Sequence, residues 1–341
     1  MKEDERVGVL LANTGTTAAP KPKETRAYLK QFLSDPRVLD IPPLKRWWIL
    51  NVFILPKRPK ESAEAFSQVW TKDGSPLLVI SEELRQALAA ELPNAVVEVG
   101  MRYGDPSIPD AIDRLLDADI ERLIIAPLFP QYASAANGSV LELAYTHVAK
   151  RWNVPPVSVL PPFYDEEEFL HAWVEVSRPL LNEFKPDHVL FSYHGLPERQ
   201  VRKSDPTGGH CLVKPDCCDQ RVPANRNCYR MHCLSTSRSL IERLDLAAEN
   251  CTTTFQSRLG NDPWLQPATD EAVPQLARDG VKRLAVMCPA FTADCLETLE
   301  EIGMRAQEDF LENGGEAFTM VPSLNSHPAW VRGLAAMLRK I

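Results

Sequence analysis

Two sets of side chains in this sequence have the types and spacing needed for proton or metal chemistry. His194 directly follows the strand-like run 189–193 and precedes a glycine. Asp294, Glu297 and Glu301 stand at i, i+3 and i+7, so a helix that begins here carries all three carboxylates on one face. A histidine with nearby carboxylates can move protons or hold a divalent cation. The alternatives are a structural histidine and a solvated helix face.

A third set consists of cysteines. Five of the eight cysteines lie in one stretch that has almost no apolar residues: Cys211, Cys217, Cys218, Cys228 and Cys233. Four thiolates bind a structural zinc ion or a [2Fe–2S] cluster, and the spacing alone leaves both open. The other three, Cys251, Cys288 and Cys295, lie in or beside predicted core elements, where we expect small buried apolar side chains.

The elements that must position these groups form an internal repeat. Short apolar runs that end at Gly or Pro alternate with helix-like stretches, including 82–92 and 294–311. The eight runs are 7–12, 96–103, 123–126, 157–160, 189–193, 252–256, 284–287 and 318–321. This alternation predicts an α/β protein with two similar Rossmann-like lobes. Each lobe is expected to have a four-stranded parallel sheet flanked by helices. The active-site cleft is expected between the lobes, outside the carboxyl ends of the strands.

The predicted boundaries follow from this repeat. Residues 1–165 form the N-terminal lobe and residues 166–325 the C-terminal lobe, with the cysteine-rich insertion at 205–233. Residues 326–341 have helical spacing and are expected to pack as a closing helix. Its core stripe is Trp330, Leu334, Met337 and Leu338.

Composition restricts the classes of partner. The chain has 341 residues, with 38 basic and 46 acidic side chains and a net charge of −8, which argues against a nucleic-acid partner. The start of the chain shows no signal-peptide pattern, which predicts a cytoplasmic location with reduced thiols. The apolar window 47–55 is too short to span a bilayer. It is expected to dip into a membrane surface, line the mouth of a pocket or form a buried helix.

The expected cleft has aromatic and apolar walls. Aromatic side chains follow several strand ends, among them Phe129, Tyr132 and Trp264. Arg102 and Arg258 occupy matching places in the two repeats, where they either clamp carboxylates of a ligand or pair with acidic residues between the lobes. A flat apolar cleft with a few basic groups suits a large planar aromatic acid.

The sequence resembles the ferrochelatase family, which inserts ferrous iron into a porphyrin in the last step of haem synthesis. The resemblance covers nearly the whole chain and rests on motifs in the family's order. They are GMRYGDPSI (100–108), FPQYASAANGS (129–139), FSYHGLPER (191–199), TFQSRLGNDPWLQPATDE (254–271), PAFTADCLETLEEI (289–302) and SLNSHPAWV near the end.

The resemblance implies a role for each matching residue. His194 is the essential histidine and Glu297 its partner carboxylate across the porphyrin, and both are expected to bind the substrate iron. Asp294 and Glu301 continue an acidic path. The porphyrin pocket is expected to include Arg102, Tyr132, Trp264 and Phe291. Residues 35–60 match the family's hydrophobic lip, through which porphyrin enters. Whether His194 accepts protons or delivers the metal is left open.

Some ferrochelatases carry a [2Fe–2S] cluster, and the resemblance favours that cluster over zinc here. The expected ligands are Cys211, Cys228 and Cys233, with Cys217 preferred to its neighbour Cys218. The expected substrates are protoporphyrin IX and Fe²⁺, handled by a monomer or weak homodimer peripheral to the inner membrane. The alternatives are coproporphyrin as substrate, another tetrapyrrole chelatase activity, and a porphyrin-binding protein without catalysis.

Overall fold

The structure is a computed structural model that describes residues 5–260 and 262–341. The chain divides into two units. The N-terminal unit contains residues 5–129, 134–161 and 331–341. The C-terminal unit contains residues 130–133 and 162–330. The short segment 130–133 therefore belongs to the C-terminal unit, although it lies within the first half of the sequence.

A parallel four-stranded sheet forms the centre of the N-terminal unit. The strand order is β2-β1-β3-β4, with Val7 of β1 paired to Ala95 of β2 and to Arg122 of β3. The strands are β1 (Val7–Gly15), β2 (Ala95–Tyr103), β3 (Arg122–Pro127) and β4 (Val157–Val159). β1 is buried along almost its whole length, as expected for a Val- and Leu-rich central strand covered on both faces.

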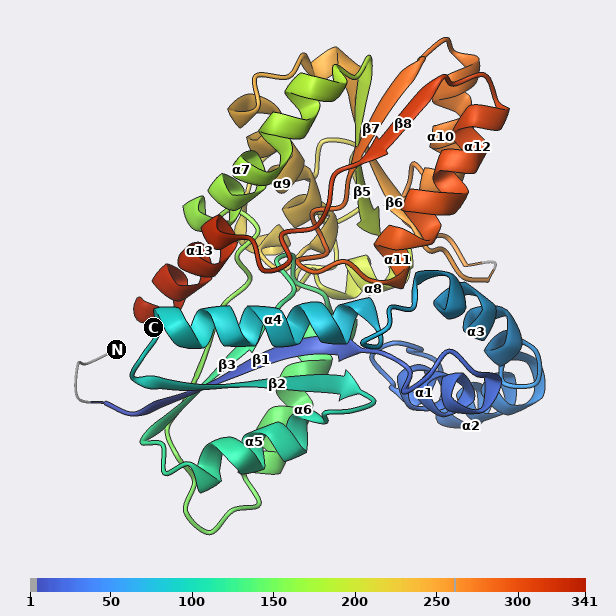
Figure 1. Ribbon diagram of the computed structural model, residues 1–341. Helices are drawn as coiled ribbons and strands as arrows, with labels where there is room; N and C mark the ends of the chain where they lie inside the picture. The colour runs from blue at the N-terminus through green and yellow to red at the C-terminus, as the bar shows by residue number, and fades with distance from the viewer. Residues whose placement is uncertain (1–4, 261) are drawn as a thin grey trace. The chain divides into compact units, whose positions relative to one another are not determined.

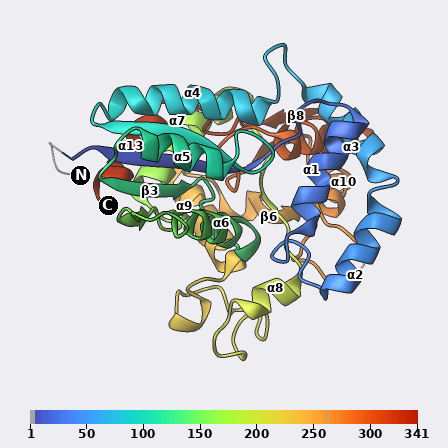
Figure 2. The same ribbon diagram turned by 90° about the horizontal axis from the view of Figure 1, so that it is seen from below.

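Helices cover both faces of this sheet. Figure 1 shows α4 on one face and α5 and α6 on the other, while α1, α2 and α3 gather beyond the carboxyl end of β1. The same three helices lie beyond that strand end in the second view (Figure 2). The helices are α1 (Pro22–Ser34), α2 (Pro43–Trp48), η1 (Ile49–Ile54), α3 (Arg58–Val69), α4 (Pro76–Glu91), α5 (Ile108–Asp117), η2 (Ser134–Gly138) and α6 (Ser139–Val148).

The C-terminal unit repeats the same sheet topology. Its strand order is β6-β5-β7-β8, all parallel, with His194 at the end of β5 paired to Gln256 at the end of β6. The strands are β5 (His188–His194), β6 (Cys251–Gln256), β7 (Arg283–Met287) and β8 (Ala317–Met320). The two sheets place their strands in equivalent chain order, which confirms the internal repeat and the predicted α/β fold class.

The helices of the C-terminal unit also form two layers. In Figure 1, α7 and α9 lie on one side of the sheet, and α10 and α12 lie on the other. The elements are α7 (Glu167–Phe184), α8 (Glu198–Lys203), η3 (Pro223–Asn225), α9 (Tyr229–Arg243), η4 (Ala248–Asn250), α10 (Thr269–Arg278), α11 (Leu296–Leu299), η5 (Glu301–Ala306) and α12 (Gln307–Glu312). The final helix, α13 (Pro328–Arg339), buries Trp330, Leu334, Met337 and Leu338, as its spacing predicts.

The helix expected at 294–311 is not continuous. The chain forms the short helix α11, then the π-helix η5, and only then the α-helix α12. Asp294 precedes α11 and therefore does not stand on a regular α-helical face with Glu297 and Glu301. A π-helix has more residues per turn than an α-helix, so the assumed i, i+3, i+7 alignment does not hold here.

Candidate active site

His194 is the last residue of β5, and one of its ring nitrogens already makes a hydrogen bond. Its Nδ1 lies 2.7 Å from the carbonyl oxygen of Gly195. A carbonyl oxygen only accepts hydrogen bonds, so Nδ1 carries the proton and donates. In the neutral imidazole, Nε2 then has a free lone pair, which can accept a proton or bind a metal ion. The backbone thus favours the tautomer of His194 in which Nε2 carries no proton.

The peptide unit between His194 and Gly195 is held from both sides. The carbonyl oxygen of His194 accepts a 2.8 Å hydrogen bond from the hydroxyl of Tyr229. The N–H of Gly195 donates to the carbonyl oxygen of Gln256 at 2.7 Å. A Cβ at position 195 would stand 2.7 Å from that same oxygen and 3.1 Å from the ring of Trp264, so only glycine fits.

Aromatic side chains lie close to this histidine. The ring centroids of His194 and Phe291 are 6.5 Å apart. Trp264 packs against Gly195, and its indole N–H donates to the carbonyl oxygen of Leu259 at 3.0 Å, which fixes the orientation of the ring. The structure therefore brings together three of the predicted site residues: His194, Phe291 and Trp264.

Gln256 connects the histidine to the acidic segment. While its backbone carbonyl holds Gly195, its side-chain amide donates to the carbonyl oxygen of Glu297 at 2.8 Å and to a carboxylate oxygen of Glu301 at 3.2 Å. Ser257 also binds the carboxylate of Glu301, through its backbone N–H at 2.8 Å and through its hydroxyl. The end of β6 and the residue after it thus hold the backbone of Glu297 and the carboxylate of Glu301.

Asp294, the third predicted carboxylate, has different hydrogen-bond partners from Glu297 and Glu301. Asp294 is buried, and its carboxylate accepts hydrogen bonds from the side chains of Asn325 at 2.8 Å and Thr298 at 2.9 Å. The backbone N–H of Ser323 adds a longer contact at 3.3 Å. In this structure the carboxylate of Asp294 therefore joins the start of α11 to the loop that follows β8.

Tyr132 belongs to the same unit and is held by α9. Its backbone N–H donates to Nδ1 of His232 at 3.1 Å, and Nε2 of His232 donates to the carbonyl oxygen of Arg226 at 2.9 Å. The ring of His232 is buried and stacks on Tyr164 with a centroid separation of 3.8 Å. Burial lowers the pKa of His232 to about 4, so the ring is neutral at physiological pH.

Arg102 lies in the N-terminal unit at the end of β2. Its guanidinium donates to a carboxylate oxygen of Asp35 at 2.7 Å and to the hydroxyl of Ser139 at 2.6 Å. The hydroxyl of Tyr103 also donates to Asp35, at 2.8 Å. This cluster joins the end of α1, the end of β2 and the start of α6. Arg258, in the C-terminal unit, pairs instead with Asp270 and Glu271.

The cysteine-rich stretch is organised by polar side chains instead of an apolar core. The carboxylate of Asp205 accepts hydrogen bonds from the backbone N–H groups of Thr207, His210 and Cys211. The amide of Asn225 donates to the carbonyl oxygens of Cys217 and Gln220. These contacts fold the segment back on itself and bury all five cysteines.

Two of the five buried sulfurs lie side by side. Cys217 Sγ and Cys218 Sγ are 3.7 Å apart. The guanidinium of Arg230 donates to Cys218 Sγ at 3.2 Å. Burial raises the pKa values of Cys211, Cys217 and Cys233. Over residues 5–260 and 262–341, no group of three or more His, Cys, Asp or Glu side chains has the arrangement of a metal site.

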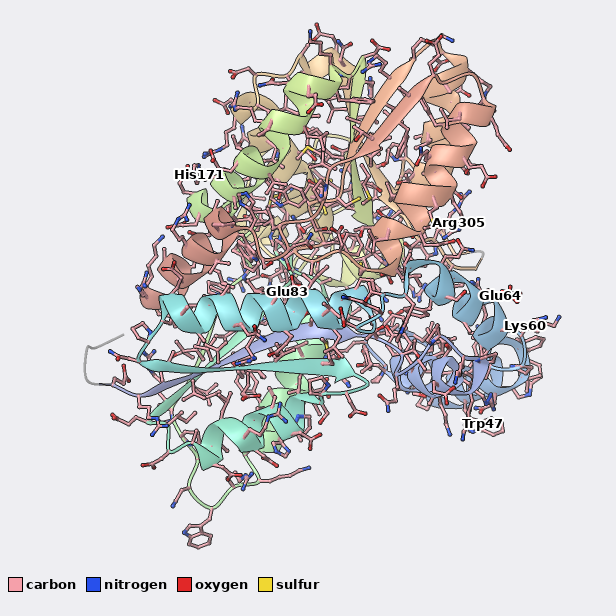
Figure 3. The ribbon with its side chains drawn as sticks, in the orientation of Figure 1. Trp47, Lys60, Glu64, Glu83, His171 and Arg305 are labelled. Carbon is pink, nitrogen blue, oxygen red and sulfur yellow. The ribbon has the colours of Figure 1, made fainter. Side chains whose placement is uncertain are left out.

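The apolar window 47–55 has two different faces. Leu50 and Leu55 are buried against Leu33 of α1. The opposite face of α2 and η1 is exposed, and Figure 3 shows Trp47 at the outer edge of this group of helices. The exposed apolar side chains are Leu44, Trp47, Trp48, Val52 and Phe53. The expectation of a fully buried helix is therefore wrong. Within the described residues, no helix is long and apolar enough to cross a membrane.

Sequence reasoning did not find four residues that position the site: Gln256, Ser257, Tyr229 and His232. For Gln256 a usable signal exists, because it ends the sixth predicted strand as His194 ends the fifth, and neighbouring parallel strands bring their carboxyl ends to one edge. For Tyr229 and His232 no such signal exists, because their partners are backbone groups far away in the sequence.

Comparison with solved structures defines the fold class. SirB from Bacillus subtilis, solved with Fe³⁺, aligns with a TM-score of 0.54 at 13% identity, over 98% of this chain and 95% of SirB. The sirohydrochlorin chelatase SirB from Bacillus subtilis subspecies spizizenii, in complex with cobalt, aligns with a TM-score of 0.52 at 11% identity. It covers 98% of this chain and 94% of that one. The chain therefore has the two-unit α/β fold of these chelatases.

Sequence comparison defines the family. The family model described as Ferrochelatase matches residues 6–341. The ferrochelatase of Coxiella burnetii (strain Dugway 5J108-111) is 44% identical over 341 residues, covering 100% of this chain and 95% of the relative. The ferrochelatase of Ectopseudomonas mendocina (strain ymp) is 46% identical over 334 residues, with 97% of each chain covered. The chain belongs to the ferrochelatase family, and it is a metal chelatase of haem synthesis.

Proposed function

We propose that this chain inserts Fe²⁺ into protoporphyrin IX through His194 and Glu297. The observation that carries this assignment is the tautomer of His194, whose Nδ1–H bonds to Gly195 and leaves the lone pair of Nε2 free. Phe291 and Trp264 beside this ring supply aromatic surface suited to a macrocycle. Tyr132, which belongs to the same unit, is a further residue of the proposed porphyrin pocket, and Arg102 in the N-terminal unit stays a predicted pocket residue on the family resemblance alone.

The reaction needs both metal exchange and proton removal. Fe²⁺ must lose coordinated water, and the two pyrrole N–H groups must release their protons as the four nitrogens bind the metal. A neutral imidazole and a carboxylate can replace water on Fe²⁺, and either can accept a proton. We propose that Glu297 faces the macrocycle from the side opposite His194, and that Glu301 and Asp294 extend an acidic path beyond it. Iron remains Fe²⁺ throughout, so the step needs no electron.

The test compares substrates under anaerobic conditions. Purified protein is supplied with Fe²⁺ and, separately, protoporphyrin IX, coproporphyrin and sirohydrochlorin, and metallation is followed by absorbance. The proposal predicts the highest kcat/KM with protoporphyrin IX. Preference for coproporphyrin would change the substrate, and preference for sirohydrochlorin would change the type of chelatase. Porphyrin that binds and is never metallated would contradict a catalytic role.

We further propose that the cysteine-rich segment holds a [2Fe–2S] cluster. The support for this proposal is the chemistry of the segment, because it buries five cysteines and Arg230 offers a positive charge against a thiolate cluster. The described side chains are not arranged as a metal site in the structure, so binding of the cluster would have to draw the sulfurs together. Burial disfavours free thiolates, and a bound metal supplies the charge that offsets this cost. Cys211, Cys228 and Cys233 are the proposed ligands. The proposed fourth ligand is Cys217, with the adjacent Cys218 as the alternative.

Colour and metal analysis test this proposal. A [2Fe–2S] protein is red-brown, bleaches with dithionite and holds about two inorganic sulfides per chain, as the cluster formula requires. Cys228→Ser is expected to lose the colour, and Cys288→Ser, in the core of the C-terminal unit, to keep it. Cys217→Ser and Cys218→Ser distinguish the two adjacent residues. A colourless protein with one zinc ion per chain would overturn the cluster.

The exposed face of α2 and η1 supports a peripheral contact with an anionic membrane. Between residues 21 and 60 the sequence has ten Lys and Arg against three Asp and Glu, whereas the whole chain carries −8. Exposed Lys45, Lys57 and Arg58 flank the apolar side chains of this face. Exposed aromatic side chains with Lys and Arg beside them are typical of proteins that bind at a membrane interface. We propose that porphyrin enters at this face while the protein is bound to the inner membrane. We also propose that the protein is a monomer or a weak homodimer, and light scattering distinguishes the two.

A further inference from the structure

Helix α9 buries a polar face where a globular helix normally buries an apolar one. Its side chains at i, i+3, i+4, i+7 and i+8 share one face of the helix. They are Tyr229, His232, Cys233, Thr236 and Ser237, and all five are buried. Buried polar groups need partners, and the partners of Tyr229 and His232 are backbone groups of His194 and Tyr132.

The first contact of this face is with His194. The hydroxyl of Tyr229 donates to the carbonyl oxygen of His194, and the N–H of the same peptide unit is held by Gln256. This peptide unit leads into Gly195, whose carbonyl oxygen accepts the Nδ1 proton of His194. Rotation of the peptide unit would move that acceptor, so Tyr229 stabilises the tautomer that leaves Nε2 free.

The second contact is with the segment 130–133. His232 accepts the backbone N–H of Tyr132, and Thr236, one turn later, accepts the side-chain amide of Gln131 at 3.1 Å. The hydroxyl of Thr236 in turn donates to the carbonyl oxygen of Tyr164 at 2.9 Å. One helix face therefore holds both the histidine and the segment that carries Tyr132.

The same helical turn belongs to the cysteine-rich segment. Cys228 immediately precedes α9, and Cys233 lies in its second turn. His232 donates to the carbonyl oxygen of Arg226, which lies between the buried Asn225 and Cys228. Tyr229 and His232 are thus placed between the five cysteines on one side and the candidate site on the other.

We propose that Tyr229 and His232 are positioning residues that hold His194 and Tyr132, respectively, and that they make both dependent on the packing of the cysteine-rich segment. The inference rests on the proposed function for its catalytic consequence. The structural link itself concerns only residues of this chain and is measurable without porphyrin.

The first experiment uses Tyr229→Phe, which removes the hydroxyl and keeps the ring. A hydrogen bond contributes about 1 kcal/mol, so we expect kcat to fall about fivefold with little change in the KM for porphyrin. Ser81→Ala is the control, because it removes a buried hydroxyl bond to Leu77 within α4 of the N-terminal unit, which contains none of these residues. A Tyr229→Phe variant with the kcat of wild type would overturn the assignment.

The second experiment uses two replacements of His232 with different geometry. In His232→Asn, Oδ1 stands near the position of Nδ1 and can still accept the N–H of Tyr132. In His232→Gln that acceptor is lost, and the side chain reaches toward Arg226 instead. We expect amide exchange at Tyr132 to accelerate at least tenfold in the Gln variant, with a higher KM for porphyrin, and to be largely restored in the Asn variant. Equal exchange in both variants would contradict the positioning role.

The third experiment changes the cysteine-rich segment and reads the site without substrate. In Cys233→Ala, amide exchange at Tyr132 and Gly195 is expected to accelerate together, while exchange in β1 stays unchanged. Unchanged exchange at both amides would overturn the link. A protein that metallates no porphyrin but shows these exchange changes would refute the proposed function and leave the structural link in place.

Discussion

At the scale of single residues, the site depends on a short backbone arrangement around His194. Nδ1–H is committed to the carbonyl oxygen of Gly195, and the peptide unit between the two residues is fixed by Tyr229 and Gln256. Such outer contacts orient a histidine and fix which nitrogen is available for chemistry. The reactivity proposed for Nε2 therefore depends on His194 together with Gly195, Tyr229 and Gln256, and not on the histidine alone.

Gly195→Ala tests this arrangement directly. The new Cβ would stand 2.7 Å from the carbonyl oxygen of Gln256, so the backbone must shift. We expect a loss of about 1–3 kcal/mol in the free energy of unfolding and at least a tenfold loss of kcat. Urea unfolding and anaerobic metallation measure the two effects. Gly209→Ala is the control, because a Cβ there meets no described atom within 4 Å. Wild-type kcat in Gly195→Ala would refute the requirement.

At the scale of elements, the strands were predictable and the helix after β7 was not. Most of the eight strands appear as short runs rich in Val, Ile and Leu, because strands buried on both faces are largely apolar. β6, with the sequence CTTTFQ, has none of these three residue types and was found through the repeat. Residues 294–311 also have helical composition, but nothing in that composition distinguishes a π-turn from an α-turn. The position of His194 at a strand end was predictable, whereas its contact with Tyr229 depends on how α9 packs.

The cluster around Asp35 gives an element-scale prediction about pH. Burial alone would raise the pKa of Asp35, but hydrogen bonds from Ser139, Arg37 and Tyr103, together with the charge of Arg102, outweigh it and lower the pKa. A carboxyl group whose pKa is lower in the folded protein than in the unfolded chain stabilises the fold at pH values above its unfolded pKa of about 3.9. This stabilisation is lost as the pH falls through the pKa of the folded protein. Asp35 therefore stabilises the junction of α1, β2 and α6 at neutral pH and loses this effect in acid.

Asp35→Asn is expected to lower the free energy of unfolding of the N-terminal unit at pH 7 by about 2 kcal/mol, because it also leaves Arg102 without its carboxylate. The difference from wild type should shrink as the pH falls below about 3.9 toward the lowered pKa of the folded carboxyl group. Urea unfolding, followed by amide exchange in β1 and β2, measures it at each pH. A difference of the same size at pH 7 and pH 2 would show that the charge of Asp35 contributes nothing.

At the scale of the whole molecule, charge is distributed unevenly along the chain. The segment from 21 to 60 is strongly basic although the protein as a whole is acidic. The apolar side chains of α2 and η1 lie on this same segment, and Trp47 is 62% exposed. The sequence showed both the charge and the apolar window, but only the structure separates the exposed side chains from Leu50 and Leu55, which pack inward.

Vesicle binding tests this surface. The double variant Trp47→Ala, Phe53→Ala should bind vesicles that contain phosphatidylglycerol about tenfold more weakly than wild type, because it removes most of the apolar area available for insertion. Raised salt should weaken the wild-type protein as well. Trp152→Ala is the control, because Trp152 is 97% exposed and lies elsewhere. Binding is measured by cosedimentation. Equal binding by the double variant and wild type would contradict a membrane contact through the exposed face of α2 and η1.

The central claim is that the free Nε2 of His194 performs the chemistry of metal insertion. The most direct measurement is the anaerobic rate of Fe²⁺ insertion into protoporphyrin IX by wild type and by His194→Ala, with porphyrin affinity and urea unfolding measured on the same samples. We expect His194→Ala to lose at least about 100-fold in kcat, which is in the range found when a proton-transfer group is removed. Folding and porphyrin binding are expected to be retained. A His194→Ala variant that is folded, binds porphyrin and turns over within twofold of wild type would contradict the claim.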